Sequence, residues 1–402
     1  MAATPEAIKP PTTTVGAIGW VRANLLSAWY NTLLTAFSVV FLYFLLKGVL
    51  TWVFVTADWS VVTSNVKLFL VGQYPSDQMW RAGAGVHMVS LFMGLSWGVW
   101  GGVARPFALT LAIGLGLSAL APVGLDSMGI GVRGFLIANP ALVAFGYLMA
   151  QTRIGQSRWL LTGWLLSFFL TLILLRGIEG IPGLPVVPTG IWGGLLLTFL
   201  LALVGIVASF PLGVLLALGR RSNLPVVKAF SIAFIELVRG VPLVSILFMG
   251  QVIMPLFLPE EIRIDRVVRV MLAITLFSSA YMAENVRGGL QAVPRGQIEA
   301  ARALGLSGSQ AMLFIVLPQA LRAVIPAIAG QFISLFKDTS LAVIVGLLEV
   351  LGIGKSIILG NVQWIGSQRE VYLFIGAIFW VFTYSLSYAS RRLETTLGVG
   401  TR

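Results

Sequence analysis

Charged and hydroxyl side chains interrupt several long apolar stretches in the second half of this chain. If those stretches cross a membrane, each charged side chain is costly to bury and is therefore a candidate for a functional site. Hydroxyls and cations can donate hydrogen bonds to a carboxylate, and a carboxylate can accept them from an ammonium group, so together they can hold a zwitterion. Such side chains could line a path for a zwitterion across the membrane. The candidates to line this translocation path near the membrane midplane are Glu236, Arg239, Ser278, Ser279, Tyr281, Glu284, Lys337, Asp338, Thr339 and Ser340.

Several of these candidates also have a purely structural interpretation. Glu236 and Arg239 are three residues apart, so they share a helical face and can form an ion pair that fixes the helix. Ser278 and Ser279 are small and can serve close packing between helices. Glu284 can instead lie at the cytoplasmic interface, where the next loop begins. The sequence leaves these alternatives open.

The composition excludes other kinds of chemistry. The 402 residues are 57% hydrophobic and 10% charged, with a mean hydropathy of +0.93, which indicates a polytopic membrane protein embedded in lipid. The absence of cysteine excludes thiol catalysis and disulfides, and the single His87 cannot build a metal cluster. The net charge of +12 comes from basic residues between apolar runs. This pattern is typical of membrane topology determinants and does not indicate a nucleic-acid partner.

The pattern of apolar runs predicts an all-α membrane protein with about ten spanning helices. A span needs roughly 20 apolar residues, and backbone groups within lipid must be satisfied inside the helix. Pro242 and Pro255 predict a kink or break in the seventh span. The expected spans are about 28–50, 86–104, 107–125, 134–150, 158–176, 191–218, 229–258, 267–286, 321–348 and 371–390.

A stretch rich in Gly and Pro, residues 177–190, divides the chain into two halves. Before it we expect a cytoplasmic tail over 1–27 and a five-span extension over 28–176, with a long polar loop outside at 51–85. After it, residues 191–395 hold the other five spans. Lys and Arg are more frequent in the segments that lie inside if the N-terminus is inside, so both termini and the loop at 295–320 are expected in the cytoplasm.

The loop at 295–320 has the sequence pattern of two short helices joined by a turn. Residues 299–304 favour a helix, and Gly305 suits a left-handed helix end. Ser307 can cap a second helix that runs to Leu317, and Pro318 is expected to interrupt the chain before the next span. Such a helix–turn–helix can dock into a groove on a partner protein.

Four segments resemble the permeases of polar amino acid uptake systems, which are bacterial ABC importers. They are IELVRGVPLV within 234–244, SSAYMAENVRGGLQAVPRGQIEAARALGLS at 278–307, LPQALRAVIPAI at 317–328 and SLFKDTSLAVIVG at 334–346. The resemblance covers about 190–395, half of the chain. The N-terminal extension resembles that of the longer of the two permeases in broad-specificity, glutamate/aspartate-type systems. We expect the extension to scaffold the complex in lipid, although no residue in it indicates a role.

This resemblance implies a type I ABC permease core and a transport subunit of an ATP-driven amino acid importer in a bacterial inner membrane, working by alternating access. It also implies the partners: a second homologous permease, two ATPase copies and a periplasmic amino-acid-binding protein. The chain itself needs no cofactor, since the ATPase binds ATP and Mg²⁺. GIGKS at 352–356 lacks the Gly of a phosphate-binding loop. The residues expected to couple to the ATPase are Glu299, Ala300, Ala301, Gly305, Leu306 and Pro318.

Two other classes of protein remain as alternatives. An ion-gradient-driven secondary amino acid transporter would be expected to have related broken helices in both halves, whereas the break signals here lie in the second half. An intramembrane enzyme would need a nucleophile, a metal or an acid/base set, which the sequence does not offer.

Overall fold

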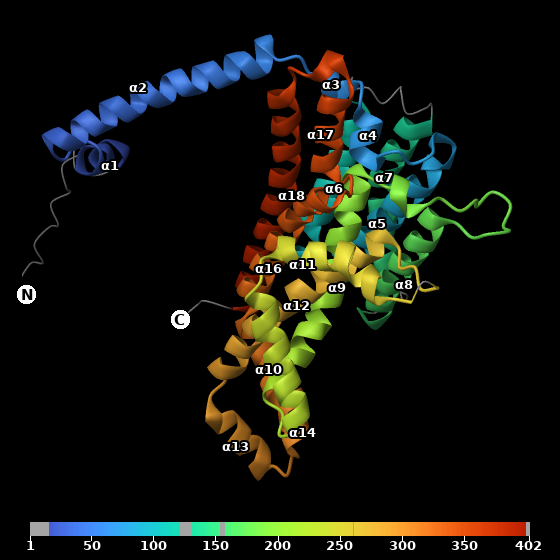
Figure 1. Ribbon diagram of the computed structural model, residues 1–402. Coiled ribbons are helices and arrows are strands. Elements are labelled where there is room, and N and C mark those ends of the chain that lie inside the picture. Colours follow the sequence, from blue (N-terminus) through green and yellow to red (C-terminus); the bar gives the residue numbers. More distant parts are fainter. Residues whose placement is uncertain (1–15, 121–130, 153–156, 260, 399–402) are drawn as a thin grey trace, which may run out of the picture. The chain divides into compact units, whose positions relative to one another are not determined.

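The computed structural model describes residues 16–120, 131–152, 157–259 and 261–398. Within these ranges the chain is almost entirely helical and forms no β-strand beyond two isolated bridges. It separates into two compact units, residues 1–59 and 60–402. Figure 1 shows the course of the chain.

The first unit contains α1 (Gly16–Asn24), α2 (Trp29–Thr51) and a π-helical turn at Trp52–Thr56. Residues 1–15 of the expected tail lie outside the described residues. No side chain of α2 is buried, and its apolar side chains are spread around the whole circumference. A helix that is apolar on every side is stable within lipid or against other membrane helices, and 29–56 has the length and composition of a membrane span.

The second unit begins with the rest of the N-terminal extension. Residues 51–85 were expected to form a long polar loop, and this prediction is wrong. Short helices occupy much of the segment, because apolar side chains such as Val61, Val66 and Phe69 are buried there. The elements are α3 (Ser60–Thr63), α4 (Val66–Val71), a 3₁₀ turn (Ser76–Gln78), α5 (Met79–Trp100), a 3₁₀ turn (Gly101–Val103), α6 (Arg105–Leu120), α7 (Gly131–Ala150) and α8 (Ser157–Arg176).

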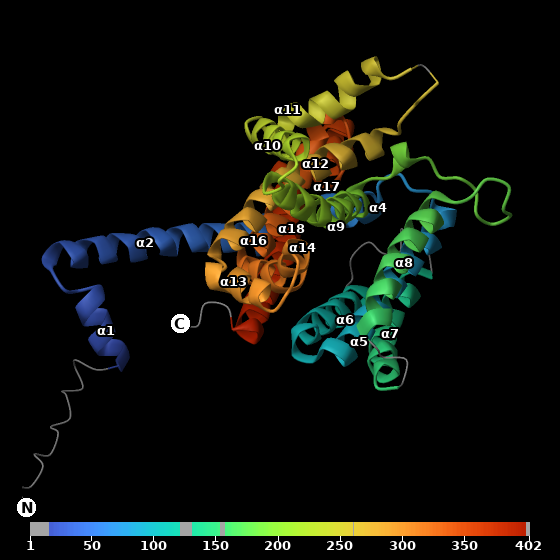
Figure 2. The same ribbon diagram turned by 90° about the horizontal axis from the view of Figure 1, so that it is seen from below.

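Helices α5, α6, α7 and α8 form a bundle, as Figures 1 and 2 show. The tightest pair is α5 with α7, where small residues let the two backbones meet. A Cβ atom at Gly94 would lie 2.1 Å from the carbonyl oxygen of Val143, and one at Gly146 would lie 2.3 Å from that of Leu91. Close approach at small residues is the usual basis of helix association in lipid.

The C-terminal half is built around α12. In the most apolar stretch of this helix, 56% of the residues are buried. Packing is close here also, since Gly213 of α9 leaves room for Met282 of α12. The elements are a 3₁₀ turn (Thr189–Ile191), α9 (Gly194–Arg220), α10 (Pro225–Arg239), α11 (Leu243–Phe248), a π turn (Met249–Ile253), a 3₁₀ turn (Met254–Phe257), α12 (Arg266–Ala292), α13 (Arg295–Ala303), α14 (Gly308–Gln310), a π turn (Ala311–Val316), α15 (Leu317–Ala323), α16 (Ile325–Asp338), a 3₁₀ helix (Thr339–Val345), α17 (Val350–Gly360), a 3₁₀ turn (Val362–Trp364) and α18 (Gln368–Leu397).

The described residues contain eight helices that are long and apolar enough to cross a membrane, and a ninth span if one bent pair counts as one. That pair, 225–239 and 243–257, is bent by 108°, as the prolines at 242 and 255 predicted. Of the remaining expected span, 107–125, the described part is helical and belongs to α6 (Arg105–Leu120). Residues 121–125 lie outside the described residues.

We expect Gly94→Val to destabilise the extension. Its side chain would meet the backbone of α7, and overpacking of this kind costs about 1–3 kcal/mol. Thermal unfolding of the purified protein should show a midpoint lowered by several degrees. Gly114→Val on α6 is the matched control, because a Cβ there meets nothing within 4 Å. Equal effects of both substitutions would show that the α5–α7 contact is unimportant.

Candidate functional site

The loop at 295–320 has the helix–turn–helix form expected from the sequence. Helix α13 ends at Ala303, and Gly305 adopts φ +82°, the left-handed conformation. The Leu306 amide donates to the carbonyl of Ala301 at 3.1 Å, which closes the helix end. Ser307 and Gln310 then form a capping box at the start of α14. The predicted turn and cap are confirmed.

Pro318 does not interrupt the second helix, and that prediction is wrong. The chain stays helical from Gly308 through α15, and the break comes at Val324. The preceding turn is a π-helix, in which the Leu317 amide reaches the carbonyl of Met312. Pro318 follows as the second residue of α15, in the first turn, where proline is tolerated.

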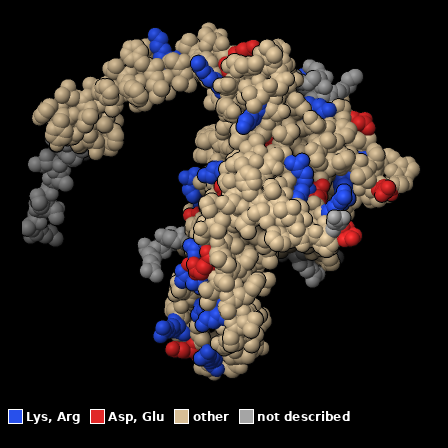
Figure 3. Space-filling view, viewed as in Figure 1, with Lys and Arg blue, Asp and Glu red and all other residues tan. Residues whose placement is uncertain are grey.

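The loop presents apolar side chains at its surface. Leu304 beside the turn is 83% exposed and Phe314 is 68% exposed. Glu299 and Ala300 are also exposed, whereas Ala301 is buried with only 3% of its surface accessible. The loop can therefore offer Leu304, Phe314 and Glu299 to a partner, whereas the Ala301 side chain lies inside. Figure 3 shows basic side chains gathered over the same end of this unit.

Five charged side chains from α9, α10 and α12 meet near the end of α12 that leads into this loop. Arg220 donates to Glu236 at 2.8 Å, and the same guanidinium lies 3.8 Å from Glu284. Arg239 lies 3.6 Å from Glu284, and Arg287 donates to it. The expected ion pair between Glu236 and Arg239 is replaced by pairs between helices, so the cluster ties three helices together.

The cluster retains unused hydrogen-bonding capacity. Among the described residues, Arg239 Nε and Glu284 Oε2 have no hydrogen-bond partner. The guanidinium of Arg239 lies 5.6 Å from the centre of the Tyr281 ring, which is within cation–π range. Three guanidinium groups face two carboxylates, so the cluster carries a net positive charge.

The other candidates do not join this cluster. The hydroxyls of Ser279, Thr339 and Ser340 each donate to the backbone carbonyl three residues earlier. Ser278 pairs with Gln331 of α16 at 3.5 Å, which fixes the register of α12 against α16.

Counted from this contact, Glu284 lies six residues farther along α12. Lys337 and Asp338 lie six and seven residues farther along α16, which leads in the opposite direction. At about 1.5 Å per residue the two charged groups are separated by roughly 18 Å along the helices. The structure therefore contains two separate polar regions, and the cluster around Glu284 is the more highly charged.

Sequence reasoning missed Arg220, which belongs to the cluster, and Glu349, a buried carboxylate that does not. Arg220 was recognised only as a topology determinant, because nothing in its neighbourhood signals a partner 16 or 64 residues away. Glu349 was also missed, although it is fully buried. Its carboxylate accepts from the amides of Leu351 and Gly352 and so caps α17. Burial raises the pKa of this carboxyl to about 7 despite the two hydrogen bonds that lower it. GIGKS at 352–356 lies inside α17.

The sequence was compared with known proteins. A family model described as "Binding-protein-dependent transport system inner membrane component" matches residues 209–398. The chain is 35% identical to the inner membrane amino-acid ABC transporter permease protein YhdY of Escherichia coli, over 96% of this chain and 94% of that protein. The chain therefore belongs to the family of amino-acid ABC transporter permeases. It is also 35% identical to the glutamate/glutamine/aspartate/asparagine transport system permease protein BztC of Rhodobacter capsulatus, over 96% of this chain and 95% of that protein.

The protein is thus a membrane-spanning permease subunit of an amino-acid ABC importer, and the secondary-transporter alternative is wrong. A shorter relative, the probable glutamine ABC transporter permease protein GlnP of Bacillus subtilis, is 37% identical over 51% of this chain and 92% of that protein. The N-terminal half is therefore an addition to a core that makes up nearly a whole permease elsewhere.

We expect Glu284→Gln to destabilise the permease, because three guanidinium groups would lose the negative charge that they share. Hydrogen bonds to charged groups contribute about 1.5–3 kcal/mol, so the thermal midpoint should fall by several degrees. Glu236→Gln is the control, since its side chain is 55% exposed and an exposed ion pair contributes about 0–1 kcal/mol. An equal or larger effect of Glu236→Gln would contradict the central place of Glu284.

Proposed function

We propose that this permease forms half of an amino acid path that opens alternately to the two sides of a bacterial inner membrane. A second homologous permease forms the other half, and a periplasmic amino-acid-binding protein delivers the substrate. Two ATPase subunits bind ATP and Mg²⁺ and drive the cycle. Both termini of the permease and the loop at 295–320 lie in the cytoplasm, as the distribution of Lys and Arg favours.

The loop transmits the motion of the ATPase. Its exposed Leu304 and Phe314 supply the apolar contacts that a helix needs to dock into a groove. The left-handed Gly305 and the capping box make the turn rigid, so force applied at the loop reaches α12 and α16. Glu299, Ala300, Ala301, Leu306 and Pro318 complete this coupling element.

The cluster of Arg220, Glu236, Arg239, Glu284 and Arg287 is the part of the path that holds the amino acid. The observation that supports this is a pair of atoms that make no hydrogen bond, Arg239 Nε and Glu284 Oε2. Two guanidinium groups lie 3.6 and 3.8 Å from that oxygen, so a substrate ammonium would bind beside them. A zwitterion brings the complementary carboxylate and ammonium. The excess of guanidinium groups favours substrates whose side chain is itself an acid or an amide, which agrees with the substrates named for BztC.

The second polar region, with Lys337, Asp338, Thr339 and Ser340, lies farther along the same path, and Ser278 and Ser279 lie between the two regions on α12. In this arrangement the amino acid passes Lys337 and Asp338 before it reaches the cluster.

Gly305→Val should uncouple ATP hydrolysis from transport while membrane insertion is unchanged. Nothing lies within 4 Å of a Cβ at this glycine, so the effect comes from its φ of +82°, at which a β-branched residue is strained by about 1–2 kcal/mol. Transport and ATPase activity of the reconstituted complex measure it. Gly296→Val adds the same side chain to open space in the same loop. Normal transport by Gly305→Val would contradict the coupling role.

Arg239→Gln should raise the substrate concentration for half-maximal transport about tenfold, because a charged hydrogen bond to the substrate carboxylate is lost. Lys337→Gln removes an exposed cation from the other polar region and should change that concentration less than about twofold. Uptake assays with a labelled amino acid, normalised to the amount of assembled complex, compare the two variants. The reverse order of effects would place the substrate at Lys337 and Asp338.

A further inference from the structure

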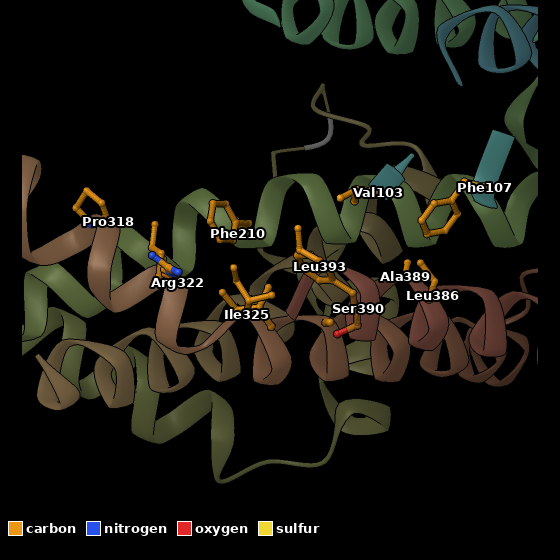
Figure 4. Close-up of a pocket in the computed structure, with 14 residues that line it drawn as sticks. Val103, Phe107, Phe210, Pro318, Arg322, Ile325, Leu386, Ala389, Ser390 and Leu393 are labelled. Atoms are coloured by element: carbon orange, nitrogen blue, oxygen red, sulfur yellow. The ribbon is translucent and has the colours of Figure 1, made fainter. Parts of the chain in front are cut away.

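An apolar cavity of about 590 Å³ lies where the N-terminal extension meets the permease core. The core contributes α9, α15, α16 and α18, and the extension contributes the turn before α6 and the start of α6. Figure 4 shows Phe107 at one end of the cavity and Pro318 with Arg322 at the other. Contacts of α18 with α6 and the preceding turn place the two halves against each other here.

The lining of this cavity does not suit the transported amino acid. It consists of aliphatic and aromatic side chains such as Phe107, Phe210 and Phe332, with Arg322 and Ser390 as the two polar residues among them. The Ser390 hydroxyl already donates to Glu394. A zwitterion would leave its charged groups unsatisfied against such walls. The volume lies within the range of about 300–1,000 Å³ that is usual for a small-molecule site.

Arg322 brings positive charge to one end of the cavity, which it lines, and it is exposed. The exposed Arg391 and Arg392 follow Ser390 on α18 outside the lining, and Arg392 donates to the Tyr388 hydroxyl. Glu394, the carboxylate that follows them, is engaged by Ser390. This is the end next to the coupling loop, so it faces the cytoplasmic leaflet in the proposed orientation. Basic pockets between helices on this side of a membrane favour anionic lipid headgroups.

We propose that the cavity is a binding site for an anionic phospholipid of the cytoplasmic leaflet. An acyl chain fills the apolar part between Phe107 and Phe332, and the phosphate lies at Arg322, Arg391 and Arg392. The site requires α6, so it is a property of permeases that carry the extension. A bound lipid fastens the extension to α15 and α16, the helices that follow the coupling loop. Lipid binding itself does not depend on the proposed substrate site.

Native mass spectrometry of the assembled transporter, exchanged into an equimolar mixture of phosphatidylglycerol and phosphatidylcholine, tests the proposal. We expect phosphatidylglycerol to be retained preferentially. Each arginine near a membrane surface favours an anionic lipid about fivefold, so Arg322→Gln with Arg391→Gln should abolish most of the preference. Arg369→Gln, an exposed site at the opposite end of α18, is the control. An unchanged preference in the double variant would overturn the proposal.

Two further variants keep the proposal testable if the arginine variants fail to assemble. Ala329→Phe fills the cavity and should lower retention of both lipids, whereas Ala327→Phe, at an exposed position of the same helix outside the lining, should not. A photoreactive p-benzoylphenylalanine at Ala389 should crosslink to a phospholipid, seen as an added lipid mass. A crosslink from this position to the second permease, or to residues 29–56 of this chain, would show that a helix fills the cavity and would overturn the proposal.

Discussion

The arrangement of the core depends on the need to neutralise charge at the ends of apolar helices. Glu284 on α12 is the common acceptor for guanidinium groups from three helices, Arg220 of α9, Arg239 of α10 and Arg287 of α12 itself. Removing any one helix would take away one of these ion pairs, and an unpaired charge is costly at Glu284, whose side chain is only 22% exposed. The cluster therefore fixes the positions of the ends of α9, α10 and α12 relative to one another.

In our proposal the same cluster joins the loop at 295–320 to the amino acid path. Helix α12 runs from Glu284 to Ala292, and α13 begins at Arg295, so any displacement of α13 acts first on the end of α12. In our account the displacement changes the distances among the guanidinium groups and carboxylates, and with them the affinity for an amino acid. Interactions of this type are strong at short range and fall as the groups separate, which makes small movements effective.

Local signals in the sequence predicted the loop well, because its turn depends on neighbouring residues. Gly305, Ser307 and Gln310 specify a left-handed turn and a capping box whatever surrounds them. The position of Pro318 was misjudged, since proline breaks a regular α-helix but fits after a π-helical turn, and nothing in the sequence announces that turn.

Features that depend on distant residues were harder to predict. Arg220 pairs with Glu236 and Glu284 only because α9, α10 and α12 converge, and one sequence does not show that convergence. The segment 51–85 was misjudged for a similar reason. Its apolar residues are too few for a span, but they are buried against the rest of the unit and so stabilise short helices.

The most direct test of this account is a crosslink from Leu304→Cys to a single cysteine on the co-expressed ATPase, made in membranes. The chain has no native cysteine, Leu304 is highly exposed, and the buried Ala301 supplies a control position. We predict a crosslink from Leu304→Cys that changes with ATP and a much weaker one from Ala301→Cys. A Leu304→Cys variant that labels only from the periplasmic side and never reaches the ATPase would contradict the account.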